Sequence, residues 1–249
     1  MDCNNELKIK TDFNSNNEEY SLRVEEKIDN LLKVNNRVWL HYGLLFSNYY
    51  EKLKDDIEDI CDNVEKLGLE VSNEMNKKYS NLDQMFSSYN LVRCVEDSKQ
   101  DSWGREVFGY FVAPNKVYTV KRTIKRLIKY MNSLDSEYKD IFNEKEIHKV
   151  ILAHEFFHFY EEKYKKTIYT KNYKVKVFKI FNLTYRSRVQ AISEIAAMEF
   201  ARQYTKIKYN PYILNYILLC NVNMIEADKI YNAVMELKNG EDLSGSNNI

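Results

Sequence analysis

The stretch HEFFH at residues 154–158 contains residue types whose spacing could bind a metal and activate water. On a helix, residues four apart lie on one face, so His154 and His158 can present two imidazoles to one Zn²⁺. Glu155 lies about 100° round the helix from His154, where it cannot easily be a third ligand. It can instead reach water held by the metal and act as a general base.

This motif is specific for a chain of this composition. Of the four histidines in the chain, two fall within it. A chance H-E-x-x-H is expected at a frequency on the order of a few per thousand such chains. The residues at 150–153 are apolar and helix-compatible. The alternative is an accidental pair of helix histidines, and the context favours a metal site.

Catalytic zinc usually has three protein ligands and one open position, so a third ligand is needed. Residue 164, where a metzincin has its third histidine, is Tyr164, which excludes that class. Glu161 and Glu162 follow too closely on the same helix to complete a tetrahedron comfortably.

Glu194 is the next carboxylate within a strongly amphipathic pattern, which predicts a helix from Arg186 to about Tyr204. It is surrounded by small and apolar residues, and a carboxylate on such a face needs a partner, which a metal supplies. We favour Glu194 as the third ligand over the alternative of a helix-surface glutamate. Glu199, in the same helix, is interpreted as such a surface residue.

Before the motif, the sequence pattern changes near residue 101 from helical to rich in β-forming residues. Residues 1–17 are predicted to be a flexible tail, and residues 18–100 a helical N-terminal module. Gly68 is either a helix stop or a tolerated break. This helical module either binds a partner or serves as a scaffold that packs against the rest of the chain, and we favour the scaffold. Polar residues 93–102 are the best linker candidate.

Residues 101–238 are predicted to form a catalytic domain with a small β-sheet. A hairpin is expected at 106–120, and the motif helix from Glu144 to about Lys166. Residues 167–185 are ambiguous, although 174–177 alternate as in a strand. Residues 239–249 read as a second flexible tail. Taken together, the predicted helices and strands indicate an α+β fold that is predominantly helical.

The overall charge and composition limit the class of protein. The net charge is zero and the pI is about 6.9, which disfavours nucleic acid as a partner. Four scattered cysteines without C-x-x-C favour reduced thiols in the cytoplasm. The N-terminus has no signal-peptide pattern, and no apolar run approaches the ~18 residues of a spanning helix. We therefore expect no membrane partner, and the oligomeric state is not predicted.

The motif followed, some tens of residues later, by a glutamate on a separate helix resembles the gluzincin branch of the zincin metalloproteases. The pattern of Glu194, Ala197, Phe200 and Ala201, with the preceding hairpin, also resembles the ImmA/IrrE group of bacterial zincins. Proteins of that group cleave regulators in the cytoplasm and are often encoded near mobile elements. The resemblance covers roughly residues 105–205.

The resemblance implies zinc held by His154, His158 and Glu194, with Glu155 as the general base. The spacing from His158 to Glu194 is longer than in that group, and residues 167–185 would be the insertion.

The expected activity is hydrolysis of a peptide bond in an intracellular protein substrate. Tyr185, Arg186 and Arg188, just upstream of Glu194, are candidates for stabilising the oxyanion. The strand at 107–112 could align the substrate as an added strand. The competing class is a non-catalytic partner-binding protein with a structural or vestigial zinc site. Retention of Glu155 favours the enzyme, because a structural site needs no base.

Overall fold

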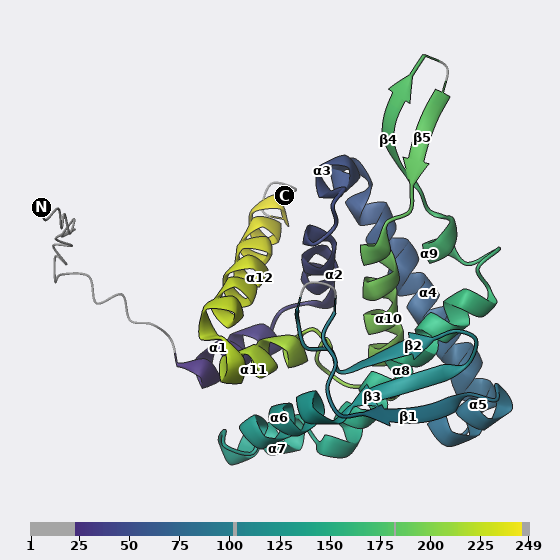
Figure 1. Ribbon diagram of the computed structural model, residues 1–249. Coiled ribbons are helices and arrows are strands. Elements are labelled where there is room, and N and C mark those ends of the chain that lie inside the picture. The colour runs from purple at the N-terminus through teal and green to yellow at the C-terminus, as the bar shows by residue number, and fades with distance from the viewer. Residues whose placement is uncertain (1–22, 102–103, 182, 246–249) are drawn as a thin grey trace, which may run out of the picture.

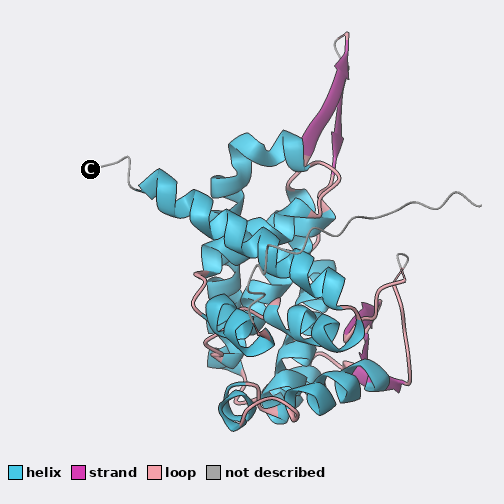
Figure 2. Ribbon diagram, turned by 90° about the vertical axis from the view of Figure 1, so that its left-hand side faces the viewer, coloured by secondary structure: helices cyan, strands magenta, loops and turns pink. Residues whose placement is uncertain are grey.

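The computed structural model describes residues 23–101, 104–181 and 183–245. Its helices are α1 (Val24–Leu32), α2 (Asn36–Leu45), α3 (Tyr50–Leu53), α4 (Ile57–Lys78), α5 (Leu82–Ser88), α6 (Lys121–Met131), α7 (Ser136–Ile141), α8 (Glu144–Lys163), α9 (Tyr169–Asn172), α10 (Gln190–Thr205), α11 (Ile213–Val222) and α12 (Met224–Gly245). Its strands are β1 (Val92–Glu96), β2 (Gly109–Val112), β3 (Lys116–Val120), β4 (Val175–Ile180) and β5 (Leu183–Ser187). Helices dominate and the strands form two small sheets (Figure 2), so the predicted α+β, predominantly helical class is confirmed.

The first sheet has the order β1-β3-β2, so β2 lies at an edge. β2 and β3 are antiparallel and form the hairpin predicted for 106–120. β1 runs parallel to β3, with Cys94 opposite Tyr118. The interpretation of 93–102 as a linker is therefore wrong over its first residues. The backbone of β1 pairs with β3, about two dozen residues further along the chain. The polarity of a segment does not reveal whether a distant strand pairs with it.

The second sheet is the antiparallel hairpin β4–β5. It accounts for the strand-like alternation of residues 174–177. It extends away from the helices in both views of the molecule (Figures 1 and 2).

The core lies between α8, α10 and the long helix α4 (Figure 1). Phe156 and Phe157 of α8 pack against Phe200 of α10, with ring centroids 5.8 and 5.6 Å apart. All three side chains are fully buried. These contacts fix the motif helix against the helix that carries Glu194.

Gly68 is a tolerated break, because α4 continues through it to Lys78. At Gly68, α4 closely approaches α10. A Cβ at Gly68 would lie 2.6 Å from Glu199 Cγ and 3.2 Å from the Phe200 backbone nitrogen. Here glycine lets two helix backbones approach, which outweighs its poor helix propensity of about 1 kcal/mol relative to alanine.

Gly68→Ala is therefore expected to lower the thermal midpoint. Overpacking of this kind costs about 1–3 kcal/mol, and each kcal/mol shifts the midpoint by roughly 2–4 °C in a chain of this size. Thermal unfolding followed by circular dichroism measures the change. Gly240→Ala in α12 is the control, since its added Cβ meets nothing within 4 Å. A Gly68→Ala protein as stable as the parent would contradict the close approach.

The N-terminal helices share one hydrophobic core with the C-terminal part of the chain. Trp39 of α2 stacks on Tyr212, with ring centroids 6.4 Å apart, and α4 packs along α10. This packing is what the scaffold interpretation of residues 18–100 expects. Whether residues 18–100 and 101–238 are separable domains stays a prediction.

The two predicted tails have different outcomes. Residues 1–17 lie outside the described part of the chain. α12 continues through Gly240 to Gly245, so the first residues of the tail predicted for 239–249 are helical, and the flexibility of that tail stays a prediction. A single glycine slows helix propagation without stopping it when helix-compatible residues follow. In the described part of the chain, no helix is long and apolar enough to cross a membrane.

Candidate metal centre

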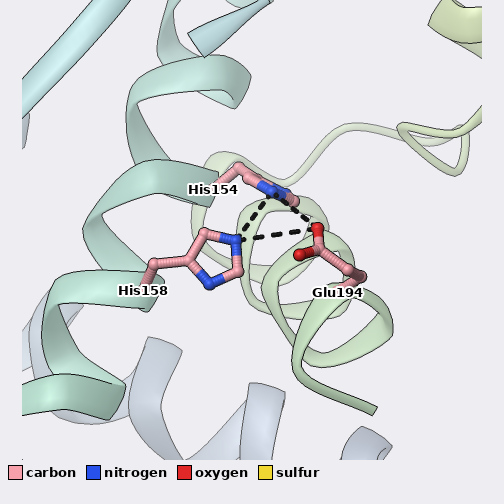
Figure 3. Close-up of side chains that lie close together, drawn as sticks. All are labelled: His154, His158 and Glu194. Atoms are coloured by element: carbon pink, nitrogen blue, oxygen red, sulfur yellow. Dashed lines mark hydrogen bonds and ion pairs between the residues drawn. The ribbon is translucent and has the colours of Figure 1, made fainter. Parts of the chain in front are cut away.

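His154, His158 and Glu194 form a cluster that could hold a metal ion, with one ligand atom from each within 4.8 Å of the others. Figure 3 shows the two imidazoles and the carboxylate pointing toward one another from α8 and α10. The two histidine Nε2 atoms are 3.1 Å apart, and Glu194 Oε2 lies 3.6 and 3.7 Å from them. Ligand atoms on a tetrahedral zinc at ~2.0–2.1 Å lie roughly 3.3 Å from one another. The donor set therefore fits such an ion.

The helices position the cluster through local signals that the sequence carries. Asn143 caps α8, its side chain accepting a hydrogen bond from the Lys145 backbone N–H at 2.9 Å. The four-residue spacing then aligns the two histidines on one face. Glu194 stands in the first turns of α10. Its side chain is 40 % exposed, whereas those of His154 and His158 are 12 % and 18 % exposed, so the cluster opens to solvent beside Glu194.

Glu155, about 100° round α8 from His154, is buried against strand β2. A Cβ added at Gly109 would lie 3.2 Å from Glu155 Cγ, so the strand backbone passes directly over this side chain. Burial raises the pKa of Glu155, while the two histidines and a backbone hydrogen bond from Phe111 act in the opposite direction. A buried carboxylate with a raised pKa, beside residues that could hold a metal ion, can serve as a proton acceptor.

Glu161 contacts the ring of His158 on the side away from the cluster. The spacing of residues along α8 did not predict this contact. Its fully buried carboxylate lies 3.1 Å from His158 Nδ1 and 3.3 Å from Lys171 Nζ. Ser193 of α10 donates a further, short hydrogen bond to the same oxygen. When Nδ1 donates its proton to Glu161, Nε2 of His158 is left to act as the ligand atom. By contrast, the buried Nδ1 of His154 has no hydrogen-bond partner among the described residues.

The charges of the cluster stabilise one another. Burial alone lowers the pKa of His158, but the carboxylates of Glu194 and Glu161 outweigh it and raise that pKa well above its ordinary value. Burial likewise raises the pKa of Glu194, but His158 and His154 outweigh it and hold the pKa well below its ordinary value. The ionised carboxylate thus requires positive charge beside it, and a bound cation would supply that charge.

Glu199 is not the surface residue that the sequence suggested. It is fully buried, and its carboxylate accepts hydrogen bonds from Arg202 at 2.7 and 3.0 Å. It also accepts from Asn36 of α2 at 3.0 Å and from Gln203 at 2.8 Å. Glu199 is buried because α2 and α4 cover this face of α10, which the periodicity of one helix cannot reveal. Its role is to join α10 to α2.

The three candidates for stabilising the oxyanion lie on or next to the β4–β5 hairpin. Tyr185 stacks on Phe178 in the β4–β5 hairpin, with ring centroids 5.0 Å apart, and is half exposed. Arg186 and Arg188 are exposed at the base of the same hairpin. Their assignment to the oxyanion stays a prediction. His148 Nε2 lies 3.9 Å from Glu144 Oε1, and His148 does not belong to the cluster.

Tyr212 is a site neighbour that sequence reasoning missed. Burial raises its pKa, and the negative charge of Glu194 acts in the same direction. Its ring stacks on Trp39. The local sequence Asn210-Pro211-Tyr212 does not distinguish this tyrosine from the nineteen other tyrosines of the chain.

Comparison of the chain with family models, with curated proteins and with solved structures gave no significant match.

Proposed function

We propose that the chain is a zinc-dependent metallopeptidase that hydrolyses a peptide bond in a cytoplasmic protein substrate. The observation that carries this proposal is the tetrahedral spacing of His154, His158 and Glu194 beside the buried carboxylate of Glu155. Two imidazoles and a carboxylate are donors that zinc accepts, and three protein ligands leave a fourth position open. The solvent-facing side near Glu194 provides access to that position.

The chain's own residues supply the proton transfers. When bound, zinc would act as a Lewis acid that acidifies water and polarises a carbonyl group. Glu155 accepts the proton on its carboxylate and delivers it to the leaving amine. The backbone of Phe111, in β2, favours the ionised form of that carboxylate by lowering its pKa. Glu161 keeps the imidazole of His158 in the tautomer that binds metal.

The substrate is proposed to pair with the free edge of β2. This strand lies at the edge of its sheet and passes over Glu155 at Gly109. An extended peptide added to this edge would be held by main-chain hydrogen bonds, next to the general base. Tyr185, Arg186 and Arg188, the candidates from the sequence, lie on or next to the β4–β5 hairpin. Tyr212 offers another hydroxyl group for the oxyanion, within the electrostatic reach of Glu194.

The alternative is a non-catalytic binding protein with a structural or vestigial zinc site. A structural zinc is normally enclosed by four protein ligands. The described cluster has three, with a side open to solvent, and a buried carboxylate beside it. These features favour the enzyme.

The function is tested by a proteome-wide search for new protein N-termini after induced expression in a bacterial host. The unsubstituted chain is expected to generate a small, reproducible set of cleavages that an empty-vector control lacks. Purified, zinc-loaded protein should reproduce the same cleavages in a lysate depleted of low-molecular-weight metal. No cleavage in either experiment would favour the binding protein.

Glu194→Gln is expected to weaken zinc binding, because an amide oxygen is a poorer ligand than a carboxylate. The loss should exceed the ~10–100-fold that removal of an outer partner costs. Glu199→Gln is the matched control in the same helix. It should keep zinc affinity and lose about 1–3 kcal/mol of folding free energy, because the buried pair with Arg202 is weakened. Competition with a chromophoric chelator measures affinity. Loss of zinc from Glu199→Gln and not from Glu194→Gln would reverse the assignment.

Glu161→Ala is expected to weaken zinc binding by about 10–100-fold, since it releases the ring of His158 from its hydrogen bond. Glu161→Gln should recover part of the loss, because its amide oxygen can still accept from Nδ1. Glu162→Gln, one residue further along and paired with Lys165 on the surface, should bind zinc like the parent. Equal zinc affinity in Glu161→Ala and the parent would remove Glu161 from the site.

A further inference from the structure

The hairpin β4–β5 has one apolar face that the rest of the described chain leaves uncovered. Its register places Phe178 opposite Tyr185 and Ile180 opposite Leu183. Cross-strand partners point to the same side of a sheet, so these four side chains share a face. The other face carries Lys176 opposite Arg186 and Lys179 opposite Thr184.

Exposure of the apolar side chains increases toward the end of the hairpin. Phe178 and Tyr185 are 48 % and 50 % exposed, Ile180 is 56 %, Leu183 is 75 % and Phe181 is 93 %. The hairpin points away from the helices in Figures 1 and 2, so its end reaches beyond the body of the protein. Contiguous exposed apolar side chains at such a position indicate a surface that is covered by a partner.

The charge around the hairpin has one sign. No acidic residue occurs between residues 163 and 193, although the chain as a whole has zero net charge. The exposed basic side chains of the strands and of the base of the hairpin are Lys174, Lys176, Lys179, Arg186 and Arg188. Within the described chain, none of these five forms an ion pair, so their charges are available to an anionic partner.

We propose that β4–β5 docks the protein on an anionic lipid bilayer by inserting Ile180, Phe181 and Leu183 into the interface. A strand advances ~3.3 Å per residue, so these residues span the ~5–10 Å that interfacial anchors penetrate. The stacked pair Phe178 and Tyr185 then lies at the depth of the headgroups, where aromatic rings concentrate. The basic side chains behind it reach the lipid phosphates.

Two other classes of partner fit less well. A nucleic-acid surface is read by basic and aromatic side chains, and the aliphatic Ile180 and Leu183 cannot stack on bases. A stable protein interface occupies about 800 Å² and 20–30 residues on each side, which the end of a two-stranded hairpin does not offer. A bilayer needs only a projecting apolar end with cations behind it. The expectation of no membrane partner rested on the lack of a spanning segment, and a surface contact needs none.

The test is sedimentation of the full chain with vesicles. Vesicles of phosphatidylcholine with about 30 % phosphatidylglycerol mimic the anionic surface, and pure phosphatidylcholine is the neutral control. We expect binding to the anionic vesicles that is at least tenfold tighter than to the neutral ones and that weakens as salt is raised. The double variant Phe181→Ser, Leu183→Ser should bind at least tenfold more weakly, since a large apolar side chain contributes roughly that factor when fully removed from water.

The matched control is Val95→Ser with Ile225→Ser, whose side chains are 71 % and 72 % exposed on β1 and α12. It should bind the anionic vesicles like the parent. In addition, Phe181→Trp should show a blue-shifted emission, relative to the parent, on mixing with anionic vesicles. Unchanged binding by the double variant, or unshifted emission, would overturn insertion of this hairpin. The full chain could instead fail to bind vesicles and form a dimer or an RNA complex that the double variant loses. That result would overturn the lipid partner in favour of a second copy of the chain or of RNA.

Discussion

Glu155→Gln is expected to keep the fold and the metal while losing peptide hydrolysis. The substitution preserves size, and the amide oxygen can still accept the hydrogen bond from Phe111. It removes the group that accepts and returns the proton. Loss of a general base typically costs about 10²–10⁴ in rate, and Glu155 acts in two proton transfers, so the loss can exceed that range.

The comparison is made by N-terminal proteomics of cells expressing each protein, with zinc content and expression level matched. The parent should generate its set of cleavages and Glu155→Gln none of them. Cleavage of the same sites at the same rate by both proteins would rule out Glu155 as the base.

Removal of either motif histidine is expected to abolish tight zinc binding. Each contributes one of the three ligand atoms, and two remaining ligands cannot hold the ion against water and buffer. His154→Ala and His158→Ala should therefore each be recovered without stoichiometric zinc, and the double variant should be recovered with none.

His148→Ala is the matched control, because His148 stands on the same helix and outside the cluster. It should retain the full zinc content. Elemental analysis of each variant, together with circular dichroism to confirm folding, provides the readout. Stoichiometric zinc in the double variant would place the metal elsewhere on the chain.

The parts of the site that local periodicity determines could be predicted from the sequence. The helix that carries residues 154–158 follows from its apolar spacing, and that spacing alone aligns His154 with His158. Glu194 could be chosen because it is a carboxylate among small and apolar residues on a helix, where an unpaired charge is costly. The hairpin β2–β3 follows from its turn signal and alternating residues.

The parts that depend on contacts between distant segments could not be predicted. Glu161 acquires its role only because α9 brings Lys171 and α10 brings Ser193 to the same oxygen. Glu199 is buried by α2 and α4, which lie more than 120 residues earlier in the chain. β1 exists because β3 offers it a parallel partner. In each case the local residues are compatible with a surface or a linker, and tertiary packing decides the outcome.

The zinc content of the unsubstituted protein tests the central claim most directly. The protein is purified without chelator, or stripped and reloaded with zinc followed by removal of the excess, and analysed for all transition metals. The account predicts about one tightly held zinc per chain, as expected for three protein ligands. A folded protein that retains no zinc after reloading, or that retains it equally when His154 and His158 are both alanine, would contradict it.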